Sequence, residues 1–302
     1  MSERSPGGIL TAVVTPFRAD ETIDYDSWRR VIEFLIAGGI DGLFVLGGGG
    51  EFYALNEEER KEAARFAVRA ANGRLPIYAN VGAVTTRDTV MLAQHAEAEG
   101  VDYVVAVTPY YIRPSADELV QHYSDLCKSV RIPVFAYNIP ARTGVELTPL
   151  MVRRISESQP NFIGLKDSSG RIELTPEWVA LGLTIFMGSD HLIQPALELG
   201  CVGAVTVCSN VAPRLFADLF RAWKDGNAKE AARLQALAAE LRLSLKLSSS
   251  RSYVKEAMSL SGMPVGLCRR PAGLMAQEER TSLDAIIGKL REHNYLPAQT
   301  LA

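Results

Sequence analysis

The chain has 302 residues, 47% of them hydrophobic, and a formal net charge of −3. A chain of this length can bury one large core, and α/β barrels reach this size as a single domain. The 32 lysine and arginine residues form no basic stripe and no apolar run reaches the ~18 residues of a membrane span, so the sequence predicts neither a nucleic-acid nor a membrane partner.

Short apolar runs rich in β-branched residues alternate with longer amphipathic stretches from the start of the chain. Several runs are apolar at consecutive positions, which is typical of strands covered on both faces. Eight runs can be counted: Ile9–Phe17, Gly42–Leu46, Ile77–Val81, Tyr103–Val107, Val134–Tyr137, Phe162–Leu165, Thr184–Met187 and Ala204–Val207. Eight strand–helix units that close on themselves predict an α/β fold, the (β/α)₈ TIM barrel.

Helix-start signals lie between these runs. Asn56, Thr85 and Ser115 each precede an acidic first turn, and Thr148 precedes a proline at the first helical position. After Trp223 the pattern becomes helical only, over Ala228–Lys246, Tyr253–Ser261 and Glu278–Glu292. We therefore expect a barrel that carries the active site at residues 1–226 and a C-terminal helical region at residues 227–302.

Active sites of such barrels lie at the carboxyl ends of the strands, where this chain is polar. Lys166 directly follows an apolar run, and an ammonium group stripped of water there is shifted toward the neutral amine that attacks a keto carbon. The alternative is a lysine that forms an ion pair with Asp167 or Asp190. The other lysines lie in helix-like segments and are expected to be solvated: Lys61, Lys128, Lys224, Lys229, Lys246, Lys255 and Lys289.

Three neighbouring features fit a keto-acid site. Tyr137 ends the preceding run, so its phenol can move protons beside Lys166, although it can equally be a core tyrosine. Arg142 offers a guanidinium for a substrate carboxylate, or a surface pair with Glu146. The N–H groups of the four glycines from Gly47 can bind a carboxylate, or the glycines can simply form a tight turn.

Other chemistries have weaker signals. The four histidines are scattered with no pair at ligand spacing, so no metal site is predicted. No Gly-x-Ser-x-Gly elbow is present, and no Gly-Lys-Ser/Thr follows the glycines. The N-terminus lacks an apolar signal segment and the cysteines lie far apart, so we expect a cytoplasmic protein with buried thiols at Cys127, Cys201, Cys208 and Cys268.

Together these residues resemble the dihydrodipicolinate synthase and N-acetylneuraminate lyase family of class I aldolases over essentially the whole chain. Residues 137–144 resemble the family segment Y-N-x-P-x-R-T-G, and residues 164–168 resemble its Schiff-base lysine motif. Residues 108–111 and 188–190 match further family segments. The resemblance implies that Lys166 forms an imine with pyruvate, that Tyr137 relays protons, and that Tyr111 reaches into the site of a neighbouring subunit in a homodimer or homotetramer. It implies no cofactor beyond the covalent lysine imine.

One segment departs from the family. Where the family has Gly-Thr-Thr-Gly-Glu or Gly-Ser-Thr-Gly-Glu, this chain has Gly47-Gly48-Gly49-Gly50-Glu51. The N–H groups of Gly48 and Gly49 can still hold a carboxylate, and we expect water to fill the space of each absent side chain. Loss of a proton-relay group typically costs ~10²–10⁴ in rate, which disfavours the synthase of lysine biosynthesis. Arg142 favours it, because the family synthases bind their second substrate through this arginine.

The sequence therefore predicts a Schiff-base lyase or aldolase that acts on pyruvate or a 2-keto-3-deoxy acid, with an aldehyde as the second small molecule. The alternatives are 4-hydroxy-tetrahydrodipicolinate synthase, which condenses pyruvate with aspartate semialdehyde, a sugar-acid dehydratase, and a non-catalytic keto-acid-binding barrel. The candidate catalytic residues are Lys166, Tyr137 and Tyr111, and the candidate substrate-binding residues are Gly48, Gly49, Arg142, Ser168, Asp190, Val207 and Ser209.

Overall fold

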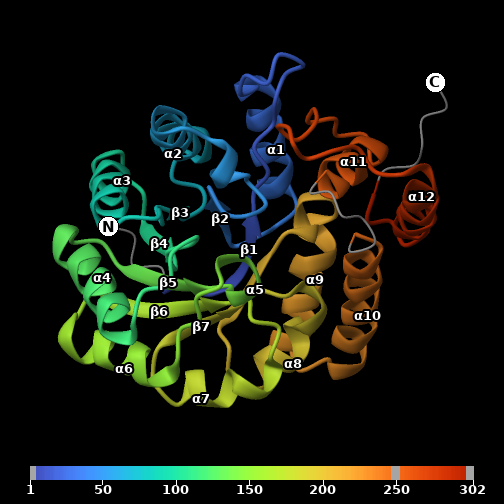
Figure 1. Ribbon diagram of the computed structural model, residues 1–302. Helices are drawn as coiled ribbons and strands as arrows, with labels where there is room; N and C mark the ends of the chain where they lie inside the picture. Colours follow the sequence, from blue (N-terminus) through green and yellow to red (C-terminus); the bar gives the residue numbers. More distant parts are fainter. Residues whose placement is uncertain (1–4, 246–251, 297–302) are drawn as a thin grey trace.

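The computed structural model describes residues 5–245 and 252–296 and contains a closed barrel of eight strands (Figure 1). Each strand pairs in parallel with its neighbours in chain order, and β8 closes onto β1. The strands are β1 Gly8–Ala12, β2 Gly42–Val45, β3 Ile77–Asn80, β4 Tyr103–Val107, β5 Val134–Asn138, β6 Phe162–Asp167, β7 Thr184–Met187 and β8 Gly203–Thr206. The predicted (β/α)₈ barrel is confirmed.

Two strand ends differ from the sequence prediction. β1 stops at Ala12, although the buried apolar run continues to Phe17. Val14 N donates to the Asn210 side-chain oxygen at 3.2 Å, and Pro16 has no N–H for a ladder, so this segment leaves the sheet. β6 continues through Asp167, which places Lys166 inside a strand and not in the loop that follows it.

Helices surround the barrel in the order expected from the alternation. The predicted caps at Asn56, Thr85, Ser115 and Thr148 each accept a hydrogen bond from the first turn of a helix. The helices are α1 Tyr25–Ala37, α2 Glu57–Ala71, α3 Thr86–Ala98, α4 Ala116–Ser129, α5 Pro140–Thr143, α6 Pro149–Ser158, α7 Thr175–Val179, α8 Ile193–Glu198 and α9 Pro213–Lys224, with short 3₁₀ turns η1 Phe52–Ala54, η2 Ile172–Leu174, η3 Asp190–Leu192 and η4 Cys208–Asn210.

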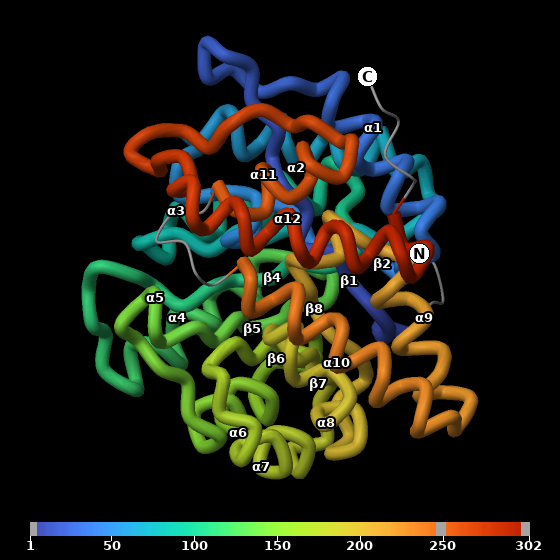
Figure 2. Tube along the Cα trace, turned by 90° about the vertical axis from the view of Figure 1, so that its right-hand side faces the viewer, coloured from blue at the N-terminus to red at the C-terminus, as the bar shows by residue number. Residues whose placement is uncertain are grey.

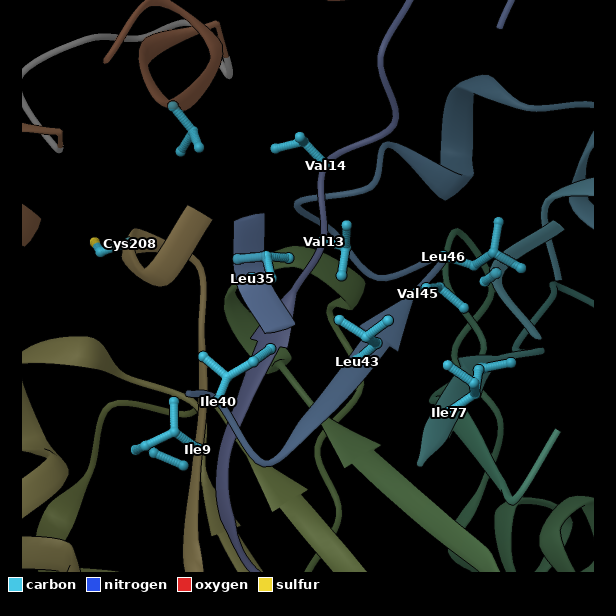
Figure 3. Packing of buried hydrophobic residues seen from close by; sticks show 14 of the residues in the cluster. Ile9, Val13, Val14, Leu35, Ile40, Leu43, Val45, Leu46, Ile77 and Cys208 are labelled. Carbon is cyan, nitrogen blue, oxygen red and sulfur yellow. The ribbon is translucent and has the colours of Figure 1, made fainter. Parts of the chain in front are cut away.

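The strands bury side chains on both faces, in two separate apolar layers. The outer layer fills the space between barrel and helices, and Figure 3 shows Ile9 and Leu43 there on the side of their strands where Leu35 and Ile40 lie. The inner layer fills the barrel with large side chains: Leu10, Phe44, Tyr78, Tyr103, Phe135, Tyr137, Phe186 and Val205 are among its members. The barrel interior is therefore a packed core, and a ligand can bind only at its end.

The C-terminal region forms α10 Ala228–Ser244, α11 Tyr253–Leu260 and α12 Gln277–Glu292, which gather on one side of the barrel (Figure 2). α10 packs against α9, and α12 packs against α10. The predicted helices agree with these bounds, except that Lys246 lies outside the described residues. The expected division between residues 1–226 and 227–302 falls between α9 and α10 and stays a prediction as a domain boundary.

The four cysteines are buried, as expected. Among the described residues, none of the helices combines the length and apolarity needed to cross a bilayer.

Candidate active site

The predicted imine-forming lysine and its tyrosine neighbour lie side by side at the carboxyl end of the barrel. Tyr137 of β5 is the register partner of Lys166 of β6. Both side chains are buried, and the Lys166 Nζ lies 3.7 Å from the centroid of the Tyr137 ring and 4.3 Å from that of Phe44. Burial opposes a charge on the amine, whereas the two ring faces favour it.

The two carboxylates considered as ion-pair partners of Lys166 make other contacts. Asp167 accepts hydrogen bonds from Asn138 Nδ2 at 2.9 Å and from the Ser169 hydroxyl at 2.8 Å. Burial raises the pKa of the Asp167 carboxyl, and these hydrogen bonds offset only part of the rise. Asp190 accepts from the backbone N–H groups that follow β8.

A cavity of about 480 Å³ lies over the inner layer of the barrel, and Lys166 and Tyr137 both line it. The predicted binding residues that also line it are Gly48, Gly49, Arg142, Ser168, Asp190 and Val207. Ala12, Val107 and Val205 belong both to its lining and to the inner layer. The structure thus brings together eight of the ten predicted site residues, while their roles stay predictions.

Ser209 does not lie at this cavity. It is fully buried in η4, its hydroxyl donates to Thr11 Oγ1 at 2.8 Å, and it also bonds the Thr206 hydroxyl. Ser209 thus joins the ends of β1 and β8, and its expected substrate contact stays a prediction. The sequence placed it only by its position after the eighth run, which does not define the direction of a side chain.

Tyr111 is also absent from the described lining of the cavity. Its side chain is 96% exposed and its φ of 74° lies in the left-handed region, which turns it away from its own barrel. Tyr110 takes the place at the cavity, with its ring 5.9 Å from that of Phe52. A catalytic role of Tyr111 therefore requires a second subunit and stays a prediction.

The glycine loop after β2 is packed more closely than expected. A Cβ atom at Gly49 would lie 2.9 Å from the Ala12 carbonyl oxygen and 3.0 Å from a Val207 methyl group. These contacts correct the expectation that a water fills the space of an absent side chain at this position. The backbone approaches β1 and the segment after β8 directly, because residue 49 has no side chain.

Asp190 and Arg242 lie next to each other in the lining of the cavity. The Asp190 carboxylate accepts from Val207 N at 3.0 Å and Cys208 N at 2.9 Å, and it lies 3.8 Å from Arg242 Nε. Burial alone would lower the pKa of Arg242, but the neighbouring Asp190 carboxylate raises it above its ordinary value. Arg242 also donates to the Tyr253 hydroxyl at 3.4 Å.

Several residues that line the cavity have no distinctive signal in the sequence. Arg242 lies on the amphipathic helix α10, where charged residues are usual and give no local signal. Other lining residues that were not predicted individually are Phe52, Tyr53, Tyr110, Ile139, Thr143, Gly188 and Ser189. Only the packing of the C-terminal region onto the barrel brings Arg242 and Tyr253 to the site.

We expect Asp190→Ala to lower the free energy of unfolding by about 3–5 kcal/mol, because it leaves a largely buried guanidinium and two backbone N–H groups without their acceptor. Urea denaturation followed by circular dichroism measures this change. The matched control is Asp218→Ala, which breaks the surface pair with Arg221 and is expected to cost less than about 1 kcal/mol. Equal losses in the two variants would contradict this account of Asp190.

Comparison with known proteins shows the family to which the chain belongs. Residues 5–290 match the model of the Dihydrodipicolinate synthetase family. The chain is 38% identical over 280 residues to the probable 2-dehydro-3-deoxy-D-pentonate aldolase YjhH of Escherichia coli, which covers 90% of this chain and 93% of that one. It is 32% identical over 287 residues to the 4-hydroxy-tetrahydrodipicolinate synthase of Bacillus subtilis, with 94% and 99% covered.

The structure of the chain also matches that of a solved relative. The crystal structure of YagE, a prophage protein of the dihydrodipicolinic acid synthase family from Escherichia coli in complex with pyruvate, matches with a TM-score of 0.91 and 34% identity, over 94% of this chain and 98% of that one. The chain therefore belongs to the dihydrodipicolinate synthetase family and is a lyase of the class I type.

Proposed function

We propose that this lyase cleaves, or in reverse forms, a carbon–carbon bond of a 2-keto-3-deoxy sugar acid through an imine at Lys166, with pyruvate as the keto-acid product. The observation that carries the proposal is the buried Lys166 amine next to Tyr137 at a cavity of about 480 Å³. Such a cavity is large enough for a polyhydroxy acid beyond a bound pyruvate unit.

The proposed reaction begins when the neutral Lys166 amine adds to the C2 carbonyl and the carbinolamine loses water. The keto-acid carboxylate binds the N–H groups of Gly48 and Gly49. The protonated imine then accepts the electron pair of the breaking C3–C4 bond, the C4 hydroxyl loses its proton, and an aldehyde leaves. Protonation of the enamine at C3 and addition of water release pyruvate, so the water lost at the start is returned. Tyr137 transfers the protons.

The choice of aldolase over synthase depends on the glycine loop. The two positions where the family synthases carry hydroxyls are Gly48 and Gly49, and a side chain at Gly49 would contact Ala12 and Val207. The site therefore lacks the relay group of the synthases. A relative with 38% identity is named a probable 2-dehydro-3-deoxy-D-pentonate aldolase, which supports the same choice.

One observation favours the synthase as the second candidate. Arg142 lines the cavity, where it can bind the carboxylate of aspartate semialdehyde. The alternative pairing of Arg142 with Glu146 is not what the structure has, because Glu146 contacts Arg171.

The remaining parts of the proposal concern cofactor, cell compartment and assembly. No external cofactor is needed, because the imine supplies the electron sink. The buried thiols are consistent with a reducing cytoplasm. We further propose a homodimer or homotetramer in which the exposed Tyr111 side chain enters the partner's site.

Light scattering is expected to give a mass of two or four chains, and Tyr111→Phe is expected to reduce turnover without changing that mass. A mass equal to one 32.9 kDa chain would contradict the shared-site role of Tyr111.

Incubation with pyruvate and sodium borohydride is expected to add one reduced pyruvate unit to the wild-type chain, because borohydride reduces an imine to a stable amine. Lys166→Ala is expected to show no adduct by intact-protein mass spectrometry. Lys61→Ala is the matched control, since Lys61 lies on α2 and pairs with Glu57 at the surface. An adduct of equal yield on Lys166→Ala would rule out the proposed role.

Product analysis is expected to distinguish the chemical alternatives. With 2-keto-3-deoxy-D-gluconate, an aldolase yields pyruvate and a three-carbon aldehyde, whereas a dehydratase yields a product with all six carbons. With pyruvate and aspartate semialdehyde, rapid condensation and no sugar-acid cleavage would instead support the synthase. Pyruvate binding without turnover of any of these substrates would support a non-catalytic barrel.

A further inference from the structure

A second lysine is buried close to the cavity. Lys255 lies on α11, and its Nζ is 2.7 Å from Glu51 Oε1, with the two side chains 1% and 2% exposed. The ammonium also donates to the Leu267 carbonyl at 3.0 Å and lies 4.2 Å from the centroid of the Phe17 ring. The expectation that Lys255 is solvated is therefore wrong, because α11 directs this side chain against Phe17 and Glu51.

Glu51 is the last residue of the glycine loop and has an unusual backbone. Its φ of 55° lies in the left-handed region, which is unfavourable for a residue with a side chain. Its second carboxylate oxygen accepts from the Arg269 backbone N–H at 3.2 Å. Both contacts of this carboxylate thus come from the C-terminal region, which holds the loop in a conformation that it would not favour alone.

The Glu51–Lys255 ion pair lies close to the Gly48 and Gly49 amides, which we assign to the substrate carboxylate. A small cavity of about 10 Å³ is lined by Gly48, Gly49, Glu51 and Lys255, together with Tyr253 from the same turn of α11. A negative charge on Glu51 without its partner would repel a carboxylate bound to the loop. Lys255 supplies the charge that cancels it.

Stability alone gives little reason to bury such a pair. Removing two charges from water costs free energy that their attraction often fails to recover, and apolar residues of similar size are frequently as stabilising. Burial lowers the pKa of Lys255, and the attraction of Glu51 offsets only part of this effect. The neighbouring Ala257 and Met258 are fully buried and already anchor α11 by apolar contacts.

We propose that Lys255 is a positioning residue for the lyase reaction, because its pairing with Glu51 fixes the loop Gly47–Gly50. The pair has no net charge, so the nearby Gly48 and Gly49 amides bind the keto-acid carboxylate without repulsion from Glu51. This inference rests on the proposed function, because it concerns the carboxylate of the keto acid that reacts with Lys166. It connects the C-terminal helical region to catalysis through one contact.

The test compares Lys255→Met with the wild-type chain in borohydride trapping at a series of pyruvate concentrations. We expect the pyruvate concentration for half-maximal trapping to rise at least roughly tenfold in Lys255→Met, equivalent to ~1.4 kcal/mol of binding. Glu51→Gln/Lys255→Met is expected to recover part of this loss, because it removes the uncompensated carboxylate. The control Lys289→Met, which breaks the exposed pair with Glu240, is expected to match wild type.

The outcomes separate this inference from the proposed function. No adduct on wild type at any pyruvate concentration contradicts the proposed function. An adduct on wild type with an unchanged half-maximal concentration in folded Lys255→Met overturns the positioning role, even if its melting temperature falls.

The double variant keeps the test decisive if Lys255→Met alone does not fold. Both charges are then absent and the side-chain lengths are kept. We therefore expect hydrogen exchange at the Glu51 and Phe52 amides, which donate to the Gly48 and Gly47 carbonyls and so close the loop, to rise at least roughly tenfold, an opening favoured by ~1.4 kcal/mol. Reference amides in α10 are expected to exchange as in wild type. Unchanged exchange in the loop would overturn the proposal.

Discussion

The pairing register between β5 and β6 is the constraint on which the active site depends. The register shifts by one residue between Val134 and Phe135, and from there Tyr137 lies opposite Lys166. A slip by one residue would turn every following side chain of β6 to the other face of the sheet and place the lysine among the outer helices. Gly164 makes this pairing possible, because a Cβ there would lie 2.2 Å from the Thr184 carbonyl oxygen and 2.4 Å from the Phe135 ring.

The barrel supplies the reacting groups, and the C-terminal region completes the cavity around them. Arg242 of α10 lies beside Asp190, Tyr253 of α11 bonds Arg242, and Lys255 of α11 pairs with Glu51 behind the glycine loop. Arg269 also connects the C-terminal region to the barrel, because its guanidinium donates hydrogen bonds to Glu59 on α2 and to the Ala54 carbonyl. Removal of this region would therefore expose the site and also release the loop that we assign to the substrate carboxylate.

The sequence predicted those parts of the molecule that have local signals. Short-range patterns predicted the eight apolar runs, helix caps such as Asn56, and a lysine at the end of a strand. The carboxyl ends of all strands of a (β/α)₈ barrel lie at one face, which predicted the location of the site. Local patterns did not predict side-chain direction and long-range packing. Ser209 bonds Thr11 between β1 and β8, Arg242 reaches the cavity from α10, and Lys255 is buried although it was expected to be solvated. None of these follows from residue type or spacing, since each depends on how a later segment packs onto an earlier one.

The presence of two buried lysines within one site region makes the location of the imine the most direct test of the account. Peptide mapping by mass spectrometry of the wild-type chain, after reaction with pyruvate and borohydride, identifies the modified residue. We predict that the reduced pyruvate unit is on Lys166, which lines the cavity, and that Lys255 is unmodified. A modified Lys255 with an unmodified Lys166 would contradict both the proposed catalytic role of Lys166 and the positioning role of Lys255.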